Sequence, residues 1–246
     1  MLWEDEGVVL ALRRHGESAA VVSLMTAAHG RHAGLVRGGA GRRARPVYQI
    51  GNRLRVTWRA RLAEQLGSFA GELQDAIAAA LLDCPDRLAA LGAACALLEA
   101  TLPERDPHPL LYNELNELIS VLQEQDEWRE RYVRFELALL AELGFGLDLT
   151  ACAVTGEPAD LAYVSPRSGR AVGRAAAGVY APRLLPLPRF LLGQGAADQA
   201  QIQAGLRLTG AFLQRHLFDA AERPMPTARE RLLRRLAGAI GPEARL

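Results

Sequence analysis

The sequence predicts an α+β fold, in which an N-terminal β-barrel precedes an all-helical domain with an irregular loop insertion. Residues 7–69 consist of short valine-rich or alternating runs separated by turns that contain glycine, which is typical of strands. From residue 71 onward, apolar residues recur at intervals of three and four, which is typical of helices. Residues 149–187 hold many glycines and prolines and follow neither period, so we expect them to be irregular.

The expected strands are short enough to close a small barrel. They are expected at residues 8–12, 19–26, 31–37, 52–59 and 62–69. Five strands within about 65 residues match the size of an OB-type barrel, whose strand face and loops bind oligonucleotides. This step is an analogy of fold, and a function has to be argued from the residues of the site.

The helical part follows from several apolar stripes. Helices are expected at residues 72–82, 85–100, 111–122, 128–143, 202–217 and 227–240, with a proline-rich linker at residues 102–109. Pro85 suits the first turn of the second helix, and Gly144 ends the fourth. We therefore expect two domains, an OB-fold nucleic-acid-binding domain at residues 1–70 and a helical domain at residues 71–246.

Basic residues gather in one part of the predicted barrel. Residues 31–61 hold nine arginines and no Asp or Glu. A glycine-rich basic loop at residues 37–46 precedes a strand in which Leu54, Val56 and Trp58 should face the core, because successive side chains of a strand point to opposite faces. Arginine forks and small glycines suit a sugar-phosphate backbone. The candidate DNA-binding residues are Arg37, Arg42, Arg43, Arg45, Arg53, Arg55 and Arg59. An ordinary solvated basic face is the other interpretation.

The net charge of +1 conceals a strong segregation of charge. The net charge is +7 over residues 1–61, −12 over residues 62–150 and +6 over residues 151–246. Such segregation favours a modular chain with different partners at different places. All 29 basic residues are arginine, which we attribute first to codon bias, so their placement is better evidence than their number. The acidic middle is either a solvated face over a helical core or a surface for docking another protein.

Composition and termini point to a reducing compartment. Cys84, Cys95 and Cys152 are too few, and odd in number, for a disulfide framework. The N-terminus carries three acidic residues where a signal peptide would need positive charge. The longest uncharged apolar run, residues 88–98, is too short to span a bilayer. We expect a cytoplasmic protein that does not insert into a membrane.

Motifs of catalysis are missing from the sequence. A lysine-containing phosphate loop is impossible without lysine, and the Gly38-Gly39-Ala40-Gly41 run opens no helix. The five histidines are scattered, and we interpret the neighbouring His29 and His32 as surface residues rather than metal ligands. We therefore expect no catalytic residues, no metal, no cofactor and no enzymatic activity.

Residues 134–156, RFELALLAELGFGLDLTACAVTG, strongly resemble the signature of the RecO family of recombination mediators. The segments YVSPRSGRA at residues 163–171, EGVVL at residues 6–10 and GGAGRRAR at residues 38–45 match as well, so the resemblance covers nearly the whole chain. It implies an N-terminal OB fold, a helical domain and no catalysis. It also implies binding of single- and double-stranded DNA, annealing of complementary strands, and help in loading RecA onto single strands. The implied protein partners are RecR and the C-terminal tail of single-stranded DNA-binding protein.

The sequence departs from this family at one place. Zinc-containing relatives carry two Cys-x-x-Cys pairs here, whereas this chain has Cys152, Thr155, Gly173 and Ala176 at the corresponding positions. One thiolate cannot supply the four ligands of a structural zinc site. We expect a zinc-free segment that hydrogen bonds and packing hold together.

Three questions stay open at this point. Tyr48 and Trp58 could stack on bases, although the alternation of its strand favours the core for Trp58. The arginines of residues 229–235 could extend the DNA track. The chain could instead be a protein-docking adaptor with incidental DNA contact, or an RNA-binding factor built on the same barrel.

Overall fold

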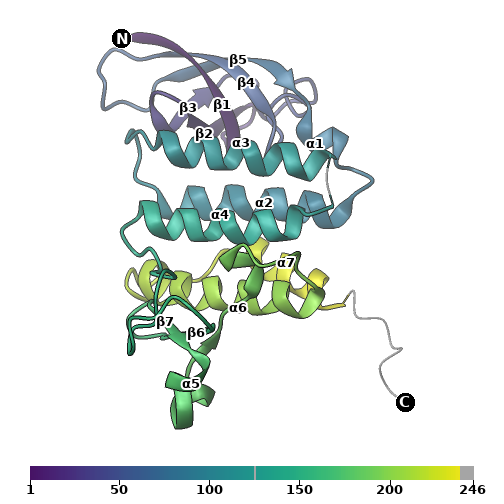
Figure 1. Cartoon of the computed structure of the whole chain (residues 1–246). Coiled ribbons are helices and arrows are strands. Elements are labelled where there is room, and N and C mark those ends of the chain that lie inside the picture. The colour runs from purple at the N-terminus through teal and green to yellow at the C-terminus, as the bar shows by residue number, and fades with distance from the viewer. Residues whose placement is uncertain (125, 239–246) are drawn as a thin grey trace. The chain divides into compact units, whose positions relative to one another are not determined.

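The computed structural model describes residues 1–124 and 126–238 and shows two compact units (Figure 1). Within the described residues, unit 1 comprises residues 1–124 and 226–238, and unit 2 comprises residues 126–225. Each unit is described by itself below. The division of the sequence at residue 70 stays a prediction.

Unit 1 begins with a five-stranded barrel. Its strands are β1 (Leu2–His15), β2 (Ala19–Thr26), β3 (Gly30–Val36), β4 (Arg53–Arg59) and β5 (Ser68–Asp75). They follow the cyclic order β1-β2-β3-β5-β4, and β4 pairs back to β1. All pairs are antiparallel except β3 with β5, which share the single position Leu35–Ser68. This single paired position closes the barrel between β3 and β5, and we call it the thin seam. The predicted α+β class with an OB-type barrel is confirmed.

The core of the barrel confirms the alternation predicted for β4. Leu54 and Val56 are fully buried and Trp58 is 1% exposed, whereas Arg55 and Arg59 point outward. The buried cluster also contains residues from the other strands and from the loop before β4. Its members are Val9, Val22, Leu24, Val36, Tyr48, Leu54, Val56, Trp58 and Phe69.

Two of the predicted strand boundaries are wrong. The first strand begins at Leu2 rather than at residue 8, because residues 2–8 pair with β4. The fifth strand is Ser68–Asp75 rather than residues 62–69, so residues 72–75 form a strand and not a helix. Both strands are rich in exposed polar residues, which hide the period of two, and it is the pairing with β4 that fixes them.

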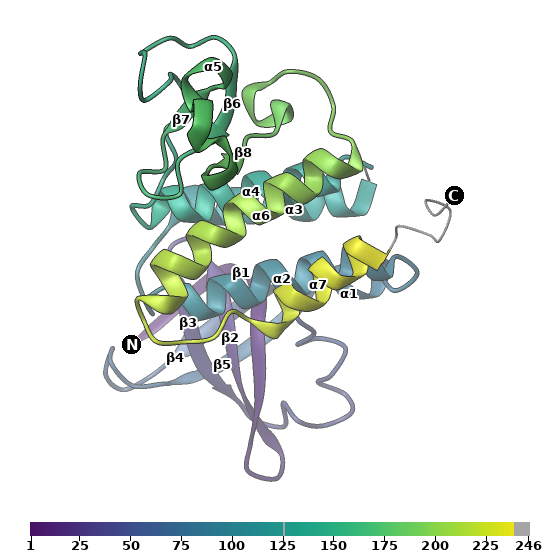
Figure 2. The ribbon, with the colours of Figure 1, turned by 90° about the horizontal axis from the view of Figure 1, so that it is seen from below.

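Helices flank the barrel within unit 1. They are α1 (Ile77–Ala80), α2 (Pro85–Thr101), α3 (Pro109–Glu124) and α7 (Thr227–Gly238). Pro85 occupies the first turn of α2, as predicted. Helix α7 lies along α2 (Figure 2), and Arg235 forms an ion pair with Asp86 at 2.7 Å. Residues 239 and 240, where we expected this last helix to end, lie outside the described residues.

The proline-rich linker packs against the barrel instead of running free. Arg105 donates its backbone N–H to Arg31 and its guanidinium to the carbonyls of Ala63 and Gln65. Gly30 adopts a φ of +63°, and a Cβ at this position would lie 1.9 Å from the carbonyl oxygen of Asp106. Only glycine allows the β2–β3 turn and the linker to come this close.

Unit 2 joins two long helices to a small sheet. Its helices are α4 (Trp128–Glu142), α5 (Arg174–Ala177), η1 (Gly178–Arg183), η2 (Arg189–Leu192), α6 (Gln199–Leu213) and η3 (Gln214–Asp219). The strands β6 (Leu161–Val164), β7 (Ala171–Gly173) and β8 (Leu185–Pro186) form a sheet in the order β7-β6-β8. The segment expected to be irregular thus contains ordered strands of two to four residues, too short to show a period in the sequence.

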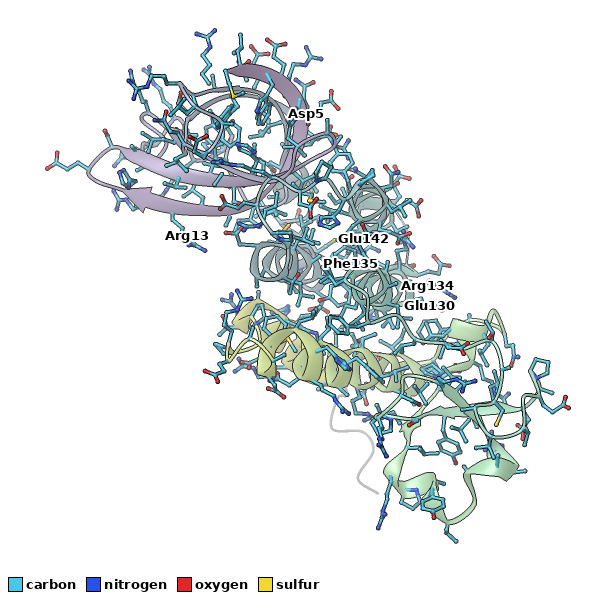
Figure 3. The ribbon with its side chains drawn as sticks, turned by 90° about the vertical axis from the view of Figure 1, so that its left-hand side faces the viewer. Asp5, Arg13, Glu130, Arg134, Phe135 and Glu142 are labelled. Atoms are coloured by element: carbon cyan, nitrogen blue, oxygen red, sulfur yellow. The ribbon has the colours of Figure 1, made fainter. Side chains whose placement is uncertain are left out.

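The α4 segment that resembles the family signature holds unit 2 together. Glu130 accepts a hydrogen bond from the N–H of Ala197, and the guanidinium of Arg134 bonds to the carbonyl of Phe190 while lying over its ring. Glu136 is fully buried and accepts a hydrogen bond from the Thr209 hydroxyl on α6. Figure 3 labels Glu130 and Arg134 on α4. These residues are structural.

Among the helices that the structure describes, none is long and apolar enough to cross a membrane.

Candidate nucleic-acid interface

A groove opens at the thin seam of the barrel. It has a volume of about 670 Å³ and receives side chains from the end of β3, the following loop, β4 and β5. The lining residues are Leu35, Val36, Arg37, Tyr48, Thr57, Arg59, Ser68, Phe69, Ala70 and Gly71. The groove therefore lies where β3 and β5 share only one paired position.

Aromatic side chains fix the apolar part of the groove. Tyr48 and Phe69 are 7% and 5% exposed, and the Tyr48 hydroxyl accepts a hydrogen bond from the N–H of Gly71 at 3.1 Å. Burial raises the pKa of Tyr48, so its phenol stays neutral. A Cβ at Gly34 would lie 2.5 Å from the Phe69 ring, so this glycine makes room for Phe69. Trp58 is not among the lining residues, because it lies in the core and its indole N–H donates to Leu66.

Two of the predicted arginines belong to the lining of the groove. Arg37 follows β3 and Arg59 ends β4, and both side chains are exposed. Neither forms a hydrogen bond or an ion pair with any residue that the structure describes. Exposed cations without a protein partner can contact phosphate without first breaking an internal bond.

The basic loop between β3 and β4 is a chain of tight turns anchored at both ends. Gly38 turns with a φ of +70°, and Ala40 donates its N–H to Ser18. At the other end Asn52 is fully buried; its amide donates to the carbonyls of Pro46 and Val47 and accepts the N–H of Ala78. The loop backbone is thus fixed beside the groove that Arg37 and Tyr48 line.

The arginines of this loop face solvent. Arg42, Arg43 and Arg45 are exposed and make no ion pair or hydrogen bond through their side chains within the described part of the chain. With Arg37 and Arg59 they form a set of five partnerless cations, which we call the groove arginines. We find no Asp or Glu among the residues that line the groove or among residues 37–52.

The remaining two predicted residues lie apart from the groove arginines. Arg53 pairs with Asp75 at 3.0 Å and donates to the side-chain oxygen of Asn116 at 2.8 Å, so it joins the barrel to α3. Arg55 is exposed, but the register places Glu6 and Glu72 opposite it on the two neighbouring strands. Acidic residues thus offset the positive charge of this part of the sheet, and the structure does not bring Arg53 or Arg55 into the groove.

Sequence reasoning missed the contribution of β5 to the groove. Ser68, Phe69, Ala70 and Gly71 line it, yet the fifth strand was expected to end at residue 69. In the structure Gly71 gives room to Tyr48, because a Cβ at this position would lie 3.1 Å from the Tyr48 hydroxyl. That close approach depends on the pairing of strands and could not be read from residue order.

The interpretation of His32 as a surface residue is wrong. His32 is 4% exposed and packs at ring-centroid distances of 4.9 Å from Trp58 and 5.0 Å from Trp3. Its pKa is lowered from 6.5 to about 4 by burial first, then by the charges of Arg105 and His29. His29 is half-buried and pairs with Asp5 at 2.9 Å. The pair therefore belongs to the end of the barrel core.

Backbone N–H groups surround the Cys152 thiol in unit 2. Cys152 is 1% exposed and its Sγ accepts the N–H of Gly173 at 3.2 Å. This hydrogen bond, followed by those from Thr155 and Val154, lowers the pKa of the thiol to about 6. Gly173 stands where the family resemblance led us to expect a cysteine in zinc-containing relatives, and in this structure its backbone N–H contacts the sulfur. In the described ranges no group of three or more His, Cys, Asp or Glu could hold a metal ion. The absence of zinc stays a prediction.

The barrel, the basic groove and the helical second unit define an OB-fold protein with features of nucleic-acid binding. Residues 1–76 match the family described as "Recombination protein O N terminal", and residues 83–223 match "Recombination protein O C terminal". This chain therefore belongs to the RecO family of DNA repair proteins.

Similar proteins match nearly its whole length. The chain is 52% identical over 240 residues to the DNA repair protein RecO of Cereibacter sphaeroides (strain KD131), covering 97% of this chain and 100% of that protein. It is 52% identical over 237 residues to the protein of the same name from Rhodospirillum centenum, covering 96% and 94%. The corresponding protein of Rhodospirillum rubrum is 51% identical over 241 residues, covering 95% and 96%. The resemblance stated from the motifs is confirmed.

Proposed function

We propose that this protein binds single- and double-stranded DNA through the groove arginines and anneals complementary strands. It acts as a mediator without catalysing a covalent reaction. The observation that carries the proposal is the set of five exposed arginines without protein partners, gathered on a groove and its bordering loop. Arg53 and Arg55, which the sequence predicts as candidates, are not part of this proposed site.

The proposed mechanism is electrostatic. Each arginine that neutralises a phosphate releases a condensed counterion, so affinity falls as salt rises, with a slope of roughly 0.7 per contact on single strands and 0.9 on duplexes. Phosphate contacts carry no sequence information, so binding should be indifferent to sequence. A strand held by its phosphates keeps its base edges free, which is the state from which it can pair with a complement.

The partners belong to the same proposal. We propose that the protein acts with RecR and with the C-terminal tail of single-stranded DNA-binding protein, and so helps to load RecA onto covered single strands. Membership of the RecO family supports this role. The tail-binding surface should combine apolar and basic residues. A direct check is whether a tail peptide and RecR each bind the purified full chain, measured by calorimetry.

The test compares two triple variants in binding and annealing of labelled single strands. Arg42/Arg43/Arg45→Ala removes three groove arginines, and Arg207/Arg215/Arg223→Ala removes three exposed arginines of unit 2 outside residues 229–235, so both lose the same charge. We expect the first variant to lose at least tenfold in affinity and in annealing rate, and the control to lose less than threefold. Equal losses in both variants would contradict the groove assignment.

Two outcomes would favour other functions. If the wild-type chain fails to bind DNA at low salt while partner proteins still bind, it is a docking adaptor. If RNA competes far better than single-stranded DNA of the same sequence, the site reads the 2′-hydroxyl and the chain is an RNA-binding factor. Our proposal predicts that RNA competes no better than DNA.

A further inference from the structure

A second stretch of arginines without acids lies in unit 2. Residues 161–197 hold five arginines and no Asp or Glu, as residues 31–61 do in the barrel. The five are Arg167, Arg170, Arg174, Arg183 and Arg189. The stretch contains the three-stranded sheet together with α5 and η1. Such a run is unusual on a mixed surface, where charges of both signs alternate.

The segment between β7 and β8 forms the tip of unit 2. Helix α5 and η1 connect these strands, and the chain turns at Gly178, whose φ is +46°. Figures 1 and 2 both show α5 on the far side of β6 from α6. We call residues 174–183 the tip. Helix α5 contacts β6 and β7, so the tip is attached to the sheet rather than free.

The tip exposes apolar groups that its fold does not use. Tyr180 is 62% exposed and Val179 is 87% exposed. A tyrosine held open to solvent offers a flat ring at low conformational cost, and such rings are stacking platforms for the bases of single strands. The patch is small, because these are the two large exposed apolar side chains of the tip, whereas stable protein interfaces bury far more apolar surface.

Arginines flank Tyr180 in the sequence on both sides. Arg183 is exposed and has no hydrogen bond or ion pair through its side chain among the described residues, and the same holds for Arg167 and Arg189. Arg174 pairs with Asp160 at 3.4 Å, but both side chains are more than half exposed, so the pair is weak and can be exchanged for phosphate. Arg170, outside the tip, pairs with Asp148 at 3.4 Å. Within the tip, Tyr180 thus lies in sequence between the weakly paired Arg174 and Arg183, which has no side-chain partner among the described residues.

We propose that the tip is a second contact site for single-stranded nucleic acid, where Tyr180 stacks on a base and Arg174 and Arg183 bind the neighbouring phosphates. The site is separate from the groove arginines in both sequence and unit. It goes beyond the proposed function, because one chain could then engage two strands, or two parts of one strand, at once.

The experiment is photo-crosslinking of the full chain to an oligothymidine strand that carries 5-iododeoxyuridine. Crosslinked peptides are then identified by mass spectrometry. The variants are Tyr180→Ala, Tyr180→Phe and Arg183→Glu. Arg207→Glu, at an exposed arginine of α6 outside the acid-free stretch, is the charge-matched control. Position 180 is largely exposed, so these substitutions leave the core of unit 2 intact.

We expect crosslinks in residues 175–183 as well as in residues 37–59. Tyr180→Ala and Arg183→Glu should each lower the tip crosslink at least fivefold, while Tyr180→Phe and Arg207→Glu leave it within twofold. Crosslinks in the barrel should be unchanged in all four variants, so loss of the tip site is distinguished from loss of the groove.

Each contrary result has a distinct meaning. Barrel crosslinks without any at the tip would overturn the second site and leave the proposed function standing. Tip crosslinks that persist in both Tyr180→Ala and Arg183→Glu would also overturn it. Tip crosslinks without barrel crosslinks would overturn the groove assignment and support the tip.

Discussion

The barrel contains two kinds of arginine that look alike in the sequence. Arg31 is half-buried, pairs with Glu99 and Glu104 at 3.4 Å each, and donates to the carbonyl of Leu102. Arg42 and Arg43 are exposed and have no such partner among the described residues. The first kind joins the barrel to the helix and linker that follow it. The second kind is available to a ligand. The arginines of such a stretch therefore have to be separated into those with and those without protein partners before a function is assigned to them.

The stability of the barrel core around His32 should depend on pH, and this is the largest effect on stability that we expect. The pKa of His32 in the folded protein is about 4, below its ordinary value of 6.5, so protons bind more readily to the unfolded chain. Stability is therefore complete above pH 6.5 and falls as the pH drops toward 4. Over the whole titration of His32 the free energy of unfolding should fall by about 3 kcal/mol, of which about 2 kcal/mol is lost between pH 7 and pH 5.

Urea unfolding at pH 7 and pH 5 measures this effect. His32→Phe keeps a ring in the aromatic cluster but cannot be protonated, so its free energy of unfolding should change with pH by about 2 kcal/mol less than that of the wild type. The comparison uses the change with pH, so any packing cost of the larger ring cancels. An equal pH dependence in both proteins would show that His32 is not the titrating group.

Removing an arginine that has protein partners should lower stability without lowering the affinity for DNA. Arg31→Met takes away one partner of each of two carboxylates, of which Glu99 has a side chain only 16% exposed and keeps Arg13 and Ser23. We expect a loss of about 2 kcal/mol in the free energy of unfolding. Single-strand affinity, measured on the folded protein, should stay within twofold of wild type. A larger loss of affinity than that of Arg42→Ala would mean that Arg31 belongs to the ligand site.

Arg53 tests the division within the predicted set itself. Arg53→Ala removes the pair with Asp75 and the bond to Asn116, so we expect about 1 kcal/mol of destabilisation. Its DNA affinity should change less than threefold. Stability is measured by thermal unfolding and DNA affinity by anisotropy. If Arg53 were a phosphate contact, the variant would lose much affinity and little stability.

Metal removal should have the smallest effect. The sulfur of Cys152 is already engaged by the N–H of Gly173, so treatment with a chelator is expected to leave the melting temperature unchanged within about 1 °C. Elemental analysis of the purified protein should find no stoichiometric zinc. Bound zinc, or a fall in the melting temperature with chelator, would show that other ligands replace the missing cysteines.

The spacing of apolar residues predicted those elements of the fold whose side chains alternate between core and solvent. The alternation of Leu54, Val56 and Trp58 was visible in the sequence because each faces the same core. The start of β1 and the position of β5 were missed because pairing with β4, rather than apolar content, holds them in the sheet. The small sheet of unit 2 was missed because its strands have two to four residues.

The candidate site was predictable only in part, for a similar reason. The loop arginines were found because no acid lies near them in sequence. Arg53 was included with them because its partner Asn116 lies 63 residues away, on a helix whose position no local pattern reveals. The groove itself depends on one paired position between β3 and β5, Leu35 with Ser68, which residue order does not disclose.

The salt dependence of single-strand binding tests the central claim most directly. Anisotropy over a salt series would compare the wild type, Arg42/Arg43/Arg45→Ala and Arg53→Ala. If the loop arginines hold phosphates, the triple variant should lose about 2 units of the slope of log affinity against log salt, and Arg53→Ala should keep the wild-type slope. A triple variant with the wild-type slope, or a shallower slope in Arg53→Ala, would contradict the account.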